Sequence, residues 1–468
     1  MHRDFVASAN EALEELKGLL DRAGGRRRVL SVTLPVDLPD PSAAVFGARM
    51  AGDRWFCWEE PDAGGFALAG LGSAYEVVSR GPERFGEVAA RCSEVLRNRI
   101  AAEPGEIPAG AGPVWVGGFA FAPEGGAQAQ WSSFPPALMT LPELTLRRHG
   151  GETLLTLCLL SGGGADPQAA LTRLRARLDA LSATELPLLD PHPSAGTRIA
   201  SVAPPEAYER AVSGAVEEIR AGRQRKVVLA REVRVDAPRA HDAGAVYGAL
   251  RTAFPSCFCF CCGSPEGAFL GASPELLIRR SGAGATTVAL AGSTRRSADP
   301  AVDDHLGEQL LRSAKDRSEQ EIVVRRIERA LRPHAVWVQA GEEPVVIKVA
   351  NIQHLATAIR AQLAEPRSAV ELAGLLHPTP AVGGEPRQAA LGAISRLEDL
   401  DRGWYAGPMG WMDAAEDGEF CVALRSALLR DRAAHLFAGA GIVAGSDPAS
   451  ELAETELKLA ALLPLLAG

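Results

Sequence analysis

Four neighbouring segments near the C-terminus decide the fold class. They read YAGPMGWMD (405–413), EFCVALRSAL (419–428), HLFAGAGIV (435–443) and PASELAETELKLAALLPL (448–465). The first three are short, largely apolar and separated by turn residues, which is typical of adjacent antiparallel strands. The fourth has the apolar spacing of a helix. Strands that are grouped, rather than alternating one by one with helices, predict an α+β fold with antiparallel sheets.

The same grouping continues upstream, from about residue 203. The pattern predicts strands at 226–231, 255–262, 267–272, 286–291, 335–340 and 345–349, and helices at 204–222, 303–331, 352–363, 367–376 and 386–397. A Pro-rich stretch at 186–196 is the candidate linker. It separates a weakly patterned part, 1–195, from the region 196–468, and we expect both to belong to one α+β unit.

The composition is that of a globular protein with a large core. The chain has 468 residues, of which 47% are hydrophobic. Its formal net charge of −9 argues against nonspecific nucleic-acid binding, which needs a basic surface. No apolar run approaches the roughly 20 residues of a membrane span, and residues 1–5 lack a signal-peptide pattern. We therefore expect a cytoplasmic protein with neither a nucleic-acid nor a membrane partner.

The eight cysteines follow neither a disulfide nor a zinc pattern. Cys257, Cys259, Cys261 and Cys262 mostly alternate along one predicted strand, and the other four are scattered in apolar stretches. A zinc site would need paired CxxC-type spacing with further ligands nearby. The cysteines are therefore predicted to be buried, reduced thiols.

Two predicted helices each place a pair of acidic residues on one face. Asp316 and Glu319 are three residues apart on the first helix, and Glu451 and Glu454 are three apart on the second. If the helices face each other, these carboxylates suit a hard cation such as Mg²⁺. The alternative is a solvated helix face on which Glu454 forms an ordinary ion pair with Lys458.

A lysine and a glutamate could carry acid–base chemistry. Lys226 opens an apolar strand; it is either a solvated strand end or, inside a closed site, a base whose pKa burial lowers. Glu275 follows Ser273 and Pro274, an order that predicts a helix start. Glu275 is then either a plain first-turn acid or a general acid that faces a cleft.

Two further segments suggest binding. The glycines of 438–442 precede the second acidic helix, and they either bring backbone amides close to an anion or form a tight turn. His354 is more typical of a hydrogen-bonded core residue than of a metal ligand.

Ten motifs, taken in order, resemble those of the chorismate-utilising enzymes. This family includes anthranilate synthase component I and salicylate synthase, and the motifs are most similar to those of isochorismate synthases. The resemblance covers about 203–465 and is loose in the N-terminal part. The motifs are KVVLAR (226–231), GASPELL (271–277), LAGS (290–293), KDRSE (315–319), IQHL (352–355), HPTPAVGG (377–384), WYAGPMG (404–410), ALR (423–425), AGAGI (438–442) and ExxETxxK (451–458).

The resemblance implies a fold, a reaction and a set of site residues. The fold would be one large unit of two mostly antiparallel sheets packed face to face with helices outside, in which 196–468 is the catalytic region. The substrate would be chorismate and the cofactor Mg²⁺. Lys226 would activate water for attack at C2, and Glu275 would protonate the departing 4-hydroxyl. The other implied residues are the metal ligands Glu319 and Glu454, Asp316 and Glu451 on metal-bound waters, Gly292, Ser293, Ala381, Gly439 and Gly441 along the pocket, His354 near the ring carboxylate, and Tyr405, Arg425 and Lys458 on the substrate carboxylates.

Related enzymes with other activities differ from this chain at single positions. Salicylate synthases also eliminate pyruvate and tend to have Thr where this chain has Ala381, although Tyr405 is compatible with either activity. Some aminating relatives carry a nucleophilic lysine where this chain has Ala291, and Lys226 fits water activation, so no amidotransferase subunit is expected. Gln320 stands where many isochorismate-forming relatives have His. A non-catalytic chorismate-binding subunit is the remaining alternative, and the downstream route (quinone, siderophore or salicylate) is left open.

Overall fold

The strands build two large sheets. The computed structural model describes residues 2–189, 196–350 and 352–467, and within them the larger sheet has 13 strands and the smaller has 10. The larger sheet runs in the order β10 (Arg198–Ser201), β11 (Lys226–Asp236), β23 (Ala433–Ile442), β22 (Ser426–Arg430), β13 (Gly267–Ser273), β12 (Phe258–Ser264), β2 (Trp55–Glu60), β3 (Phe66–Leu71), β8 (Leu144–His149), β9 (Glu152–Ser161), β1 (Arg28–Val36) and β5 (Ile100–Ala102), with β19 (Gly384–Glu385) paired to β11. The pair β1–β5 is parallel and the other neighbours are antiparallel.

The smaller sheet continues the antiparallel pattern. Its order is β16 (Ala335–Ala340), β18 (Ile352–Leu363), β15 (Gly284–Arg295), β14 (Leu276–Ser281), β21 (Gly418–Val422), β20 (Pro408–Asp413), β6 (Val114–Phe119), β7 (Ala137–Leu141) and β4 (Tyr75–Ser79), with β17 (Val345–Lys348) paired to β18. The α+β prediction with two mostly antiparallel sheets is confirmed.

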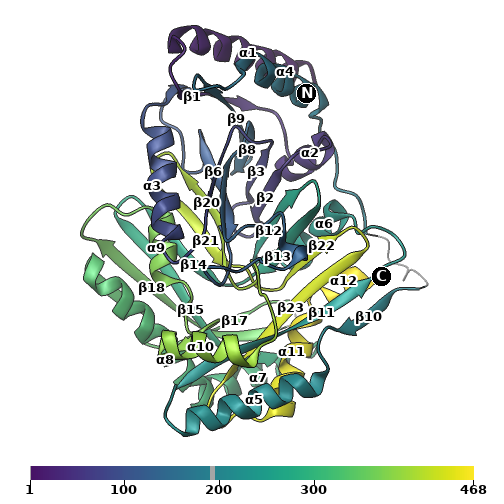
Figure 1. The fold of residues 1–468 in the computed structure, drawn as a ribbon, viewed down its shortest axis with the longest axis vertical. Coiled ribbons are helices and arrows are strands. Elements are labelled where there is room, and N and C mark those ends of the chain that lie inside the picture. Colours follow the sequence, from purple (N-terminus) through teal and green to yellow (C-terminus); the bar gives the residue numbers. More distant parts are fainter. Residues whose placement is uncertain (1, 190–195, 351, 468) are drawn as a thin grey trace.

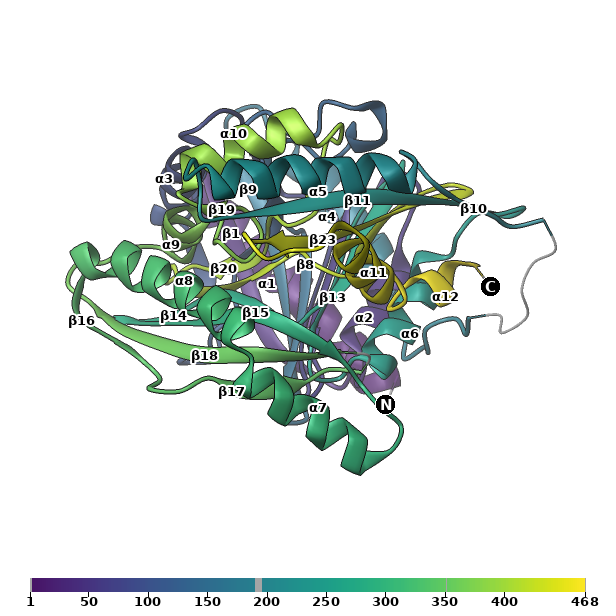
Figure 2. The same ribbon diagram turned by 90° about the horizontal axis from the view of Figure 1, so that it is seen from below.

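Helices surround the sheets, as Figures 1 and 2 show. One group joins the apolar cluster on the outer face of the larger sheet: α1 (His2–Ala23), α2 (Pro41–Ala48), α4 (Pro167–Ala180), α6 (Ala243–Ala253) and α12 (Leu463–Ala467). A second group contacts the smaller sheet: α3 (Arg84–Arg97), α7 (Pro300–Arg312), α8 (Ala314–Leu331) and α9 (Ala369–Leu376). A third group contacts β11 and β23: α5 (Pro205–Arg220), α10 (Arg387–Leu397) and α11 (Pro448–Leu459). Short 3₁₀ turns cover Ala129–Trp131 and Arg332–His334.

The main core lies between the two sheets. Trp58 and Phe260 enter it from the larger sheet, and Trp115 and Phe420 enter it from the smaller one; all four are fully buried. Along β12 the side chains alternate between this core and the apolar cluster beneath the outer helices. All eight cysteines lie in the described part of the chain, where they are buried and unpaired, so the prediction of buried thiols is confirmed.

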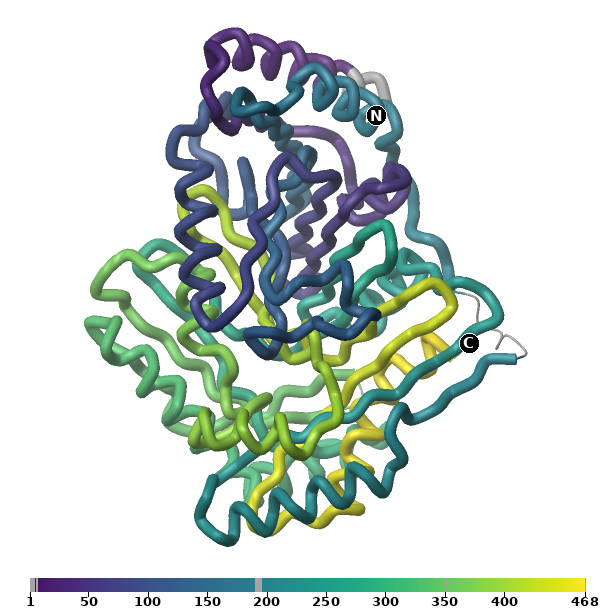
Figure 3. Tube along the Cα trace, in the orientation of Figure 1, coloured from purple at the N-terminus to yellow at the C-terminus, as the bar shows by residue number. Residues whose placement is uncertain are grey.

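Strands from both sides of the candidate linker share each sheet. β2 pairs with β12 in the larger sheet, and β6 pairs with β20 in the smaller one. Figure 3 shows the N-terminal part of the trace, in purple and blue, packed against the green and yellow C-terminal strands. Of the linker candidate, residues 190–195 lie outside the described part of the chain. In that part, no helix combines the length and the apolar character needed to cross a membrane.

Two helix predictions were wrong. The segment 352–363 is the strand β18, which pairs with β15 on one side and with β16 and β17 on the other. Its many alanines favour a helix locally, but ladders on both sides override that preference. The predicted helix 303–331 is interrupted at Ser313, whose hydroxyl accepts a hydrogen bond from the Asp316 amide and so caps α8.

Two crossings between the sheets replace predicted regular elements. Ser273 starts no helix; the chain passes there from β13 in the larger sheet to β14 in the smaller one. The predicted strand 419–428 is interrupted at 423–425, where the chain passes back from β21 to β22. The two connections run side by side, because the Val422 amide donates to Glu275 O (3.0 Å) and the Ala272 amide donates to Arg425 O (3.2 Å).

Two element boundaries near the C-terminus also differ from those that the sequence predicts. The segment 438–442 lies inside β23 and forms no separate turn. The last predicted helix ends at Leu459, and Leu463–Ala467 forms a second short helix.

Candidate active site

One pocket gathers most of the predicted site residues. It is lined from β11 and β23 of the larger sheet, β15 and β18 of the smaller one, both sheet crossings, and helices α8 and α11. Lys226 and Glu451 stand directly behind the lining and contact it through ion pairs. The predicted residues that line it are Glu275, Gly292, Ser293, Asp316, Glu319, His354, Ala381, Tyr405, Arg425, Gly439, Gly441, Glu454 and Lys458.

Glu275 is held at the first crossing as a buried acid. Its side chain lies in the pocket wall and only 3% of the residue is exposed. Burial raises the pKa of Glu275 to about 8, although Lys226, a contact with Thr379 and Lys458 pull it down. The Ser273 hydroxyl accepts a hydrogen bond from the Glu275 amide and fixes the backbone of this turn. Glu275 is therefore predominantly protonated at neutral pH.

Arg425 is held at the second crossing with an unused donor. Its backbone φ is +45°, a conformation that costs a non-glycine residue roughly 1–3 kcal/mol and is typical of functional sites. Arg425 Nη2 donates to His354 Nε2 (2.9 Å), and Nη1 is buried without a hydrogen-bond partner in the described part of the chain. An unpaired buried guanidinium nitrogen fits an anionic ligand.

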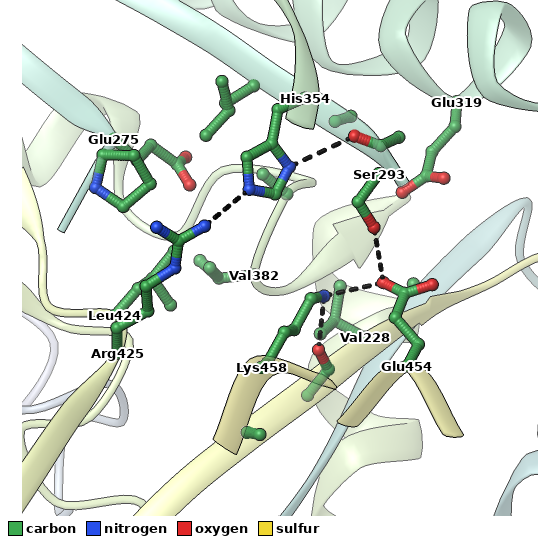
Figure 4. Close-up of a pocket in the computed structure, with 18 of the residues that line it drawn as sticks. Val228, Glu275, Ser293, Glu319, His354, Val382, Leu424, Arg425, Glu454 and Lys458 are labelled. Carbon is green, nitrogen blue, oxygen red and sulfur yellow. Dashed lines mark hydrogen bonds and ion pairs between the residues drawn. The ribbon is translucent and has the colours of Figure 1, made fainter. Parts of the chain in front are cut away.

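His354 holds this arginine in place. Its Nδ1 lies 3.2 Å from Gly292 O, and its Nε2 faces Arg425 (Figure 4). Burial, with the charges of Arg425 and Lys458, lowers the pKa of His354 well below its ordinary value. The ring is therefore neutral: Nδ1–H donates to Gly292 and Nε2 accepts from Arg425.

Lys226 stands directly behind the pocket lining. It opens β11, its side chain is 0% exposed, and its Nζ lies 2.7 Å from Glu319 Oε1. A Cβ at position 441 would lie 2.5 Å from that oxygen and 3.1 Å from Lys226 Cε. Glycine at 441 is thus required for the lysine and the carboxylate to meet.

The two acidic helices converge on the same space. Glu454 on α11 contacts Lys458 Nζ (2.7 Å) and accepts from Ser293 Oγ (3.1 Å), so the predicted ion pair is present and Glu454 also faces the pocket. Figure 4 shows Glu319 and Glu454 on the same side of the pocket as Ser293. Glu451 on α11 lies 3.2 Å from Lys315 Nζ on α8.

The carboxylates of the two helices shift one another's pKa values. Burial chiefly, and the charges of Glu319 and Glu454 after it, raise the pKa of Asp316. Burial and Glu454 likewise raise the pKa of Glu451. Burial also opposes ionisation of Glu454, but Lys458 and Ser293 outweigh it and hold the pKa of Glu454 below its ordinary value.

These oxygens fit Mg²⁺ and a bound anion better than a closed metal site. In the described ranges, no three His, Cys, Asp or Glu side chains come close enough together to hold a metal ion on their own. Mg²⁺ commonly takes one or two carboxylates and fills its other positions with water and substrate oxygens. Glu319 and Glu454, both facing the pocket, offer such a pair.

Tyr405 closes the pocket beside β23. Its ring stacks on Phe437 with the centroids 5.3 Å apart, and its hydroxyl lies 3.3 Å from where a Cβ at position 439 would stand. Burial raises the pKa of Tyr405, so the phenol stays neutral and can donate a hydrogen bond.

Some pocket residues were not predicted. Lys315 belongs to the KDRSE motif, but no function is predicted for it from the sequence. Its position next to the candidate metal-site residue Asp316 is the feature that could have marked it as a pocket residue. The apolar wall carries no chemical signature in the sequence, because its members look like ordinary strand and turn residues. It comprises Val228, Leu290, Val382, Leu424 and Phe437.

The chain is similar to known proteins along most of its length. The family described as chorismate binding enzyme matches residues 11–467, including the N-terminal part, where the motifs are only loosely similar. The chain is 38% identical to the salicylate biosynthesis isochorismate synthase of Pseudomonas aeruginosa, over 99% of this chain and 96% of that protein. It is 32% identical to the isochorismate synthase MenF of Bacillus subtilis, over 94% of each. The structure of the menaquinone-specific isochorismate synthase MenF of Escherichia coli superposes with a TM-score of 0.80 at 29% identity, covering 98% of this chain and 99% of that one.

Proposed function

This chain belongs to the chorismate-binding enzymes, and on that basis we propose that it is an isochorismate synthase that uses Mg²⁺. It is an isomerase: water adds at C2 of chorismate and the 4-hydroxyl leaves. The observation that carries the proposal is a single pocket that combines a buried protonated acid, an unpaired guanidinium and two acidic helices.

The reaction needs a base and an acid at the same time. Water is a poor nucleophile and hydroxide is a poor leaving group, and a positioned base or acid each raises the rate by a factor of roughly 10²–10⁴. Glu275, which is protonated at neutral pH, gives its proton to the departing 4-hydroxyl. The attacking water loses one proton to the base, so the ring gains and loses one hydroxyl and the product is an isomer of the substrate.

We assign the base to Lys226. Its amine stands directly behind the pocket lining, 2.7 Å from Glu319 Oε1, and Gly441 leaves the space in which these two side chains meet. A lysine acts as a base through the lone pair of its neutral amine. Lys226 and Glu275 then act on the nucleophile and on the leaving group, respectively.

Chorismate carries two carboxylates, and the site offers cations for them. Arg425 Nη1 is the free donor for one carboxylate, with Tyr405 and Lys458 beside it. The pairing of β22 with β23 ends at Leu436, so the next residues of β23, which include Gly439 and Gly441, have a strand partner on the β11 side and turn their other edge to the pocket.

Glu319 and Glu454 would hold the Mg²⁺, and Asp316 and Glu451 would hold its water ligands. When bound, the ion would supply the positive charge that lets a substrate carboxylate approach the acidic helices. The buried, unpaired cysteines support a cytoplasmic location, where they would stay reduced.

Product identity tests the proposed function. Purified protein incubated with chorismate and Mg²⁺ should yield isochorismate, without pyruvate and without any need for ammonium. Salicylate with pyruvate would indicate a salicylate synthase instead, and an aminated ring in the presence of ammonium would indicate an aminating enzyme. Binding of chorismate without any turnover would indicate a non-catalytic subunit.

Activity should fall as the pH rises through about 8. Burial raises the pKa of Glu275 from 4.5 to about 8, and the acid must keep its proton to act.

The stability of the fold should depend on the same proton. The folded chain holds a proton that the unfolded chain releases, so the stability contributed by protonated Glu275 is complete below about pH 4.5 and is lost as the pH rises to about 8. Thermal unfolding at pH 6 and pH 9 should show this loss in the wild type and less of it in Glu275→Gln.

Removing the Glu454 carboxylate should weaken the dependence on Mg²⁺. In Glu454→Gln, the concentration of Mg²⁺ that gives half-maximal activity should rise roughly tenfold or more, because one charged ligand is lost. Glu456→Gln is the matched control, since Glu456 lies on the same helix but pairs with Arg231. An unchanged Mg²⁺ titration in Glu454→Gln would remove Glu454 from the metal site.

A further inference from the structure

The charges around the pocket are balanced. Among the described residues that line it, three carboxylates face three cationic side chains. Glu275, with a pKa of about 8, and His354 are neutral at pH 7. The binding of a dication alone, or of a dianion alone, therefore unbalances the pocket, whereas binding both keeps it neutral. The charged lining residues are Asp316, Glu319 and Glu454 against Lys315, Arg425 and Lys458.

Lys315 differs from the other basic side chains in and behind the pocket lining. Lys226 and Lys458 each contact one pocket glutamate at 2.7 Å, and Arg425 is buried against His354. The Lys315 side chain is instead 47% exposed although the residue lines the pocket, and it reaches from α8 to Glu451 on α11. It thereby links the two acidic helices without standing at the positions of the proposed acid and base.

Lys315 acts on the acidic group as a positive charge. Its side chain is 47% exposed and its Nζ lies 3.2 Å from Glu451 Oε1, so the amine carries the usual charge of a lysine at neutral pH. Its charge acts on every ion that approaches these carboxylates, because Coulomb interactions extend beyond direct contact.

We propose that Lys315 is the counter-ion of the two acidic helices, and that its charge weakens the binding of Mg²⁺ and strengthens the binding of dianionic chorismate. This inference rests on the proposed function, in which both ligands enter one pocket. Without the lysine charge, the pocket would carry one net negative charge, which attracts a dication more and repels a dianion. A lysine that only tied α8 to α11 would, when removed, weaken the binding of both ligands.

The variant Lys315→Met separates the two cases. Methionine keeps a long flexible side chain without the charge. In the absence of substrate, isothermal titration should give a Kd for Mg²⁺ that is lower by roughly three- to tenfold, the size expected for a half-exposed charge a few Å away. In a Glu275→Gln background, which prevents turnover, the Kd for chorismate at saturating Mg²⁺ should rise by a similar factor. Both shifts should shrink as the salt concentration rises.

Two control variants sharpen the result. Lys315→Arg keeps the charge and should leave both affinities close to those of the wild type. Lys348→Met also removes a half-exposed lysine, but one that pairs with Asp303 and Asp304 outside the pocket lining, and it should change neither affinity.

The outcomes distinguish this inference from the proposed function. If the wild type binds Mg²⁺ and Lys315→Met binds it equally or more weakly, the counter-ion role is overturned and the metal site stands. If both affinities fall together, Lys315 acts only as a structural tie, and the role is again overturned. If the wild type binds no Mg²⁺ at all, the metal of the proposed function is wrong, and the counter-ion role falls with it.

Discussion

Replacing Glu275 by Gln should lower kcat by roughly 10²–10⁴-fold while chorismate binding stays within a few-fold of the wild type. Glutamine keeps the shape of the side chain and can donate a hydrogen bond, but it cannot transfer a proton to the leaving hydroxyl. The interaction that is lost belongs to the transition state, so the change should appear in kcat and not in the Kd of chorismate. Steady-state kinetics and isothermal titration of the same preparation measure the two quantities.

A second buried carboxyl provides the matched control. Glu419 on β21 is also buried, and burial together with Glu60 raises its pKa well above the ordinary value, but it does not line the pocket. Glu419→Gln should therefore keep its turnover, which would show that the loss in Glu275→Gln does not follow from removing any buried acid. Turnover in Glu275→Gln close to that of the wild type would exclude Glu275 as the acid.

Local chemical motifs predicted the site better than the elements that carry it. Glu275 was identified as a candidate acid although the helix expected to hold it does not exist. The order Ser273, Pro274, Glu275 satisfies the rules of a helix start, yet these residues connect two buried strands in different sheets. The Ser273 hydroxyl accepts a hydrogen bond from the Glu275 amide, as a helix cap would, but it donates to the carbonyl of Val422, which lies 149 residues away.

The strand β18 is a second element whose type cannot be predicted from its local sequence. Its alanines and its length of 12 residues suit a helix when the segment is considered alone. Its identity as a strand comes from ladders with β15, β16 and β17, and a single sequence does not reveal such partners. The fold class was still predictable, because it depends on how the strands are grouped and not on any single segment.

Ion pairing around the pocket could be predicted only within one helix. Glu454 and Lys458 are four residues apart, so their contact follows from helix geometry. The pairs of Lys226 with Glu319 and of Lys315 with Glu451 join elements that are distant in the sequence, and no spacing rule reaches them. The counter-ion role inferred for Lys315 depends on such a long-range pair.

Replacing Lys226 by Ala should lower kcat by roughly 10²–10⁴-fold, because the group that removes a proton from the attacking water is lost. Chorismate binding should change little, since the amine stands behind Gly441 and outside the pocket lining. The substitution also leaves Glu319 without its partner at 2.7 Å, so a fall in stability is expected alongside the loss of turnover. Stability must therefore be measured separately, by thermal unfolding.

Two further experiments separate the base from the ion pair. Lys226→Arg keeps a positive charge beside Glu319, but a guanidinium does not lose its proton in proteins, so this variant should keep most of the stability and still lack turnover. In Lys226→Ala, small primary amines added to the solution should restore part of the rate in the cavity left by the side chain, and the restored rate should rise with the fraction of the amine that is unprotonated. Wild-type turnover in Lys226→Arg would contradict the assignment, because an arginine that supports the reaction would leave the lysine only its charge to contribute.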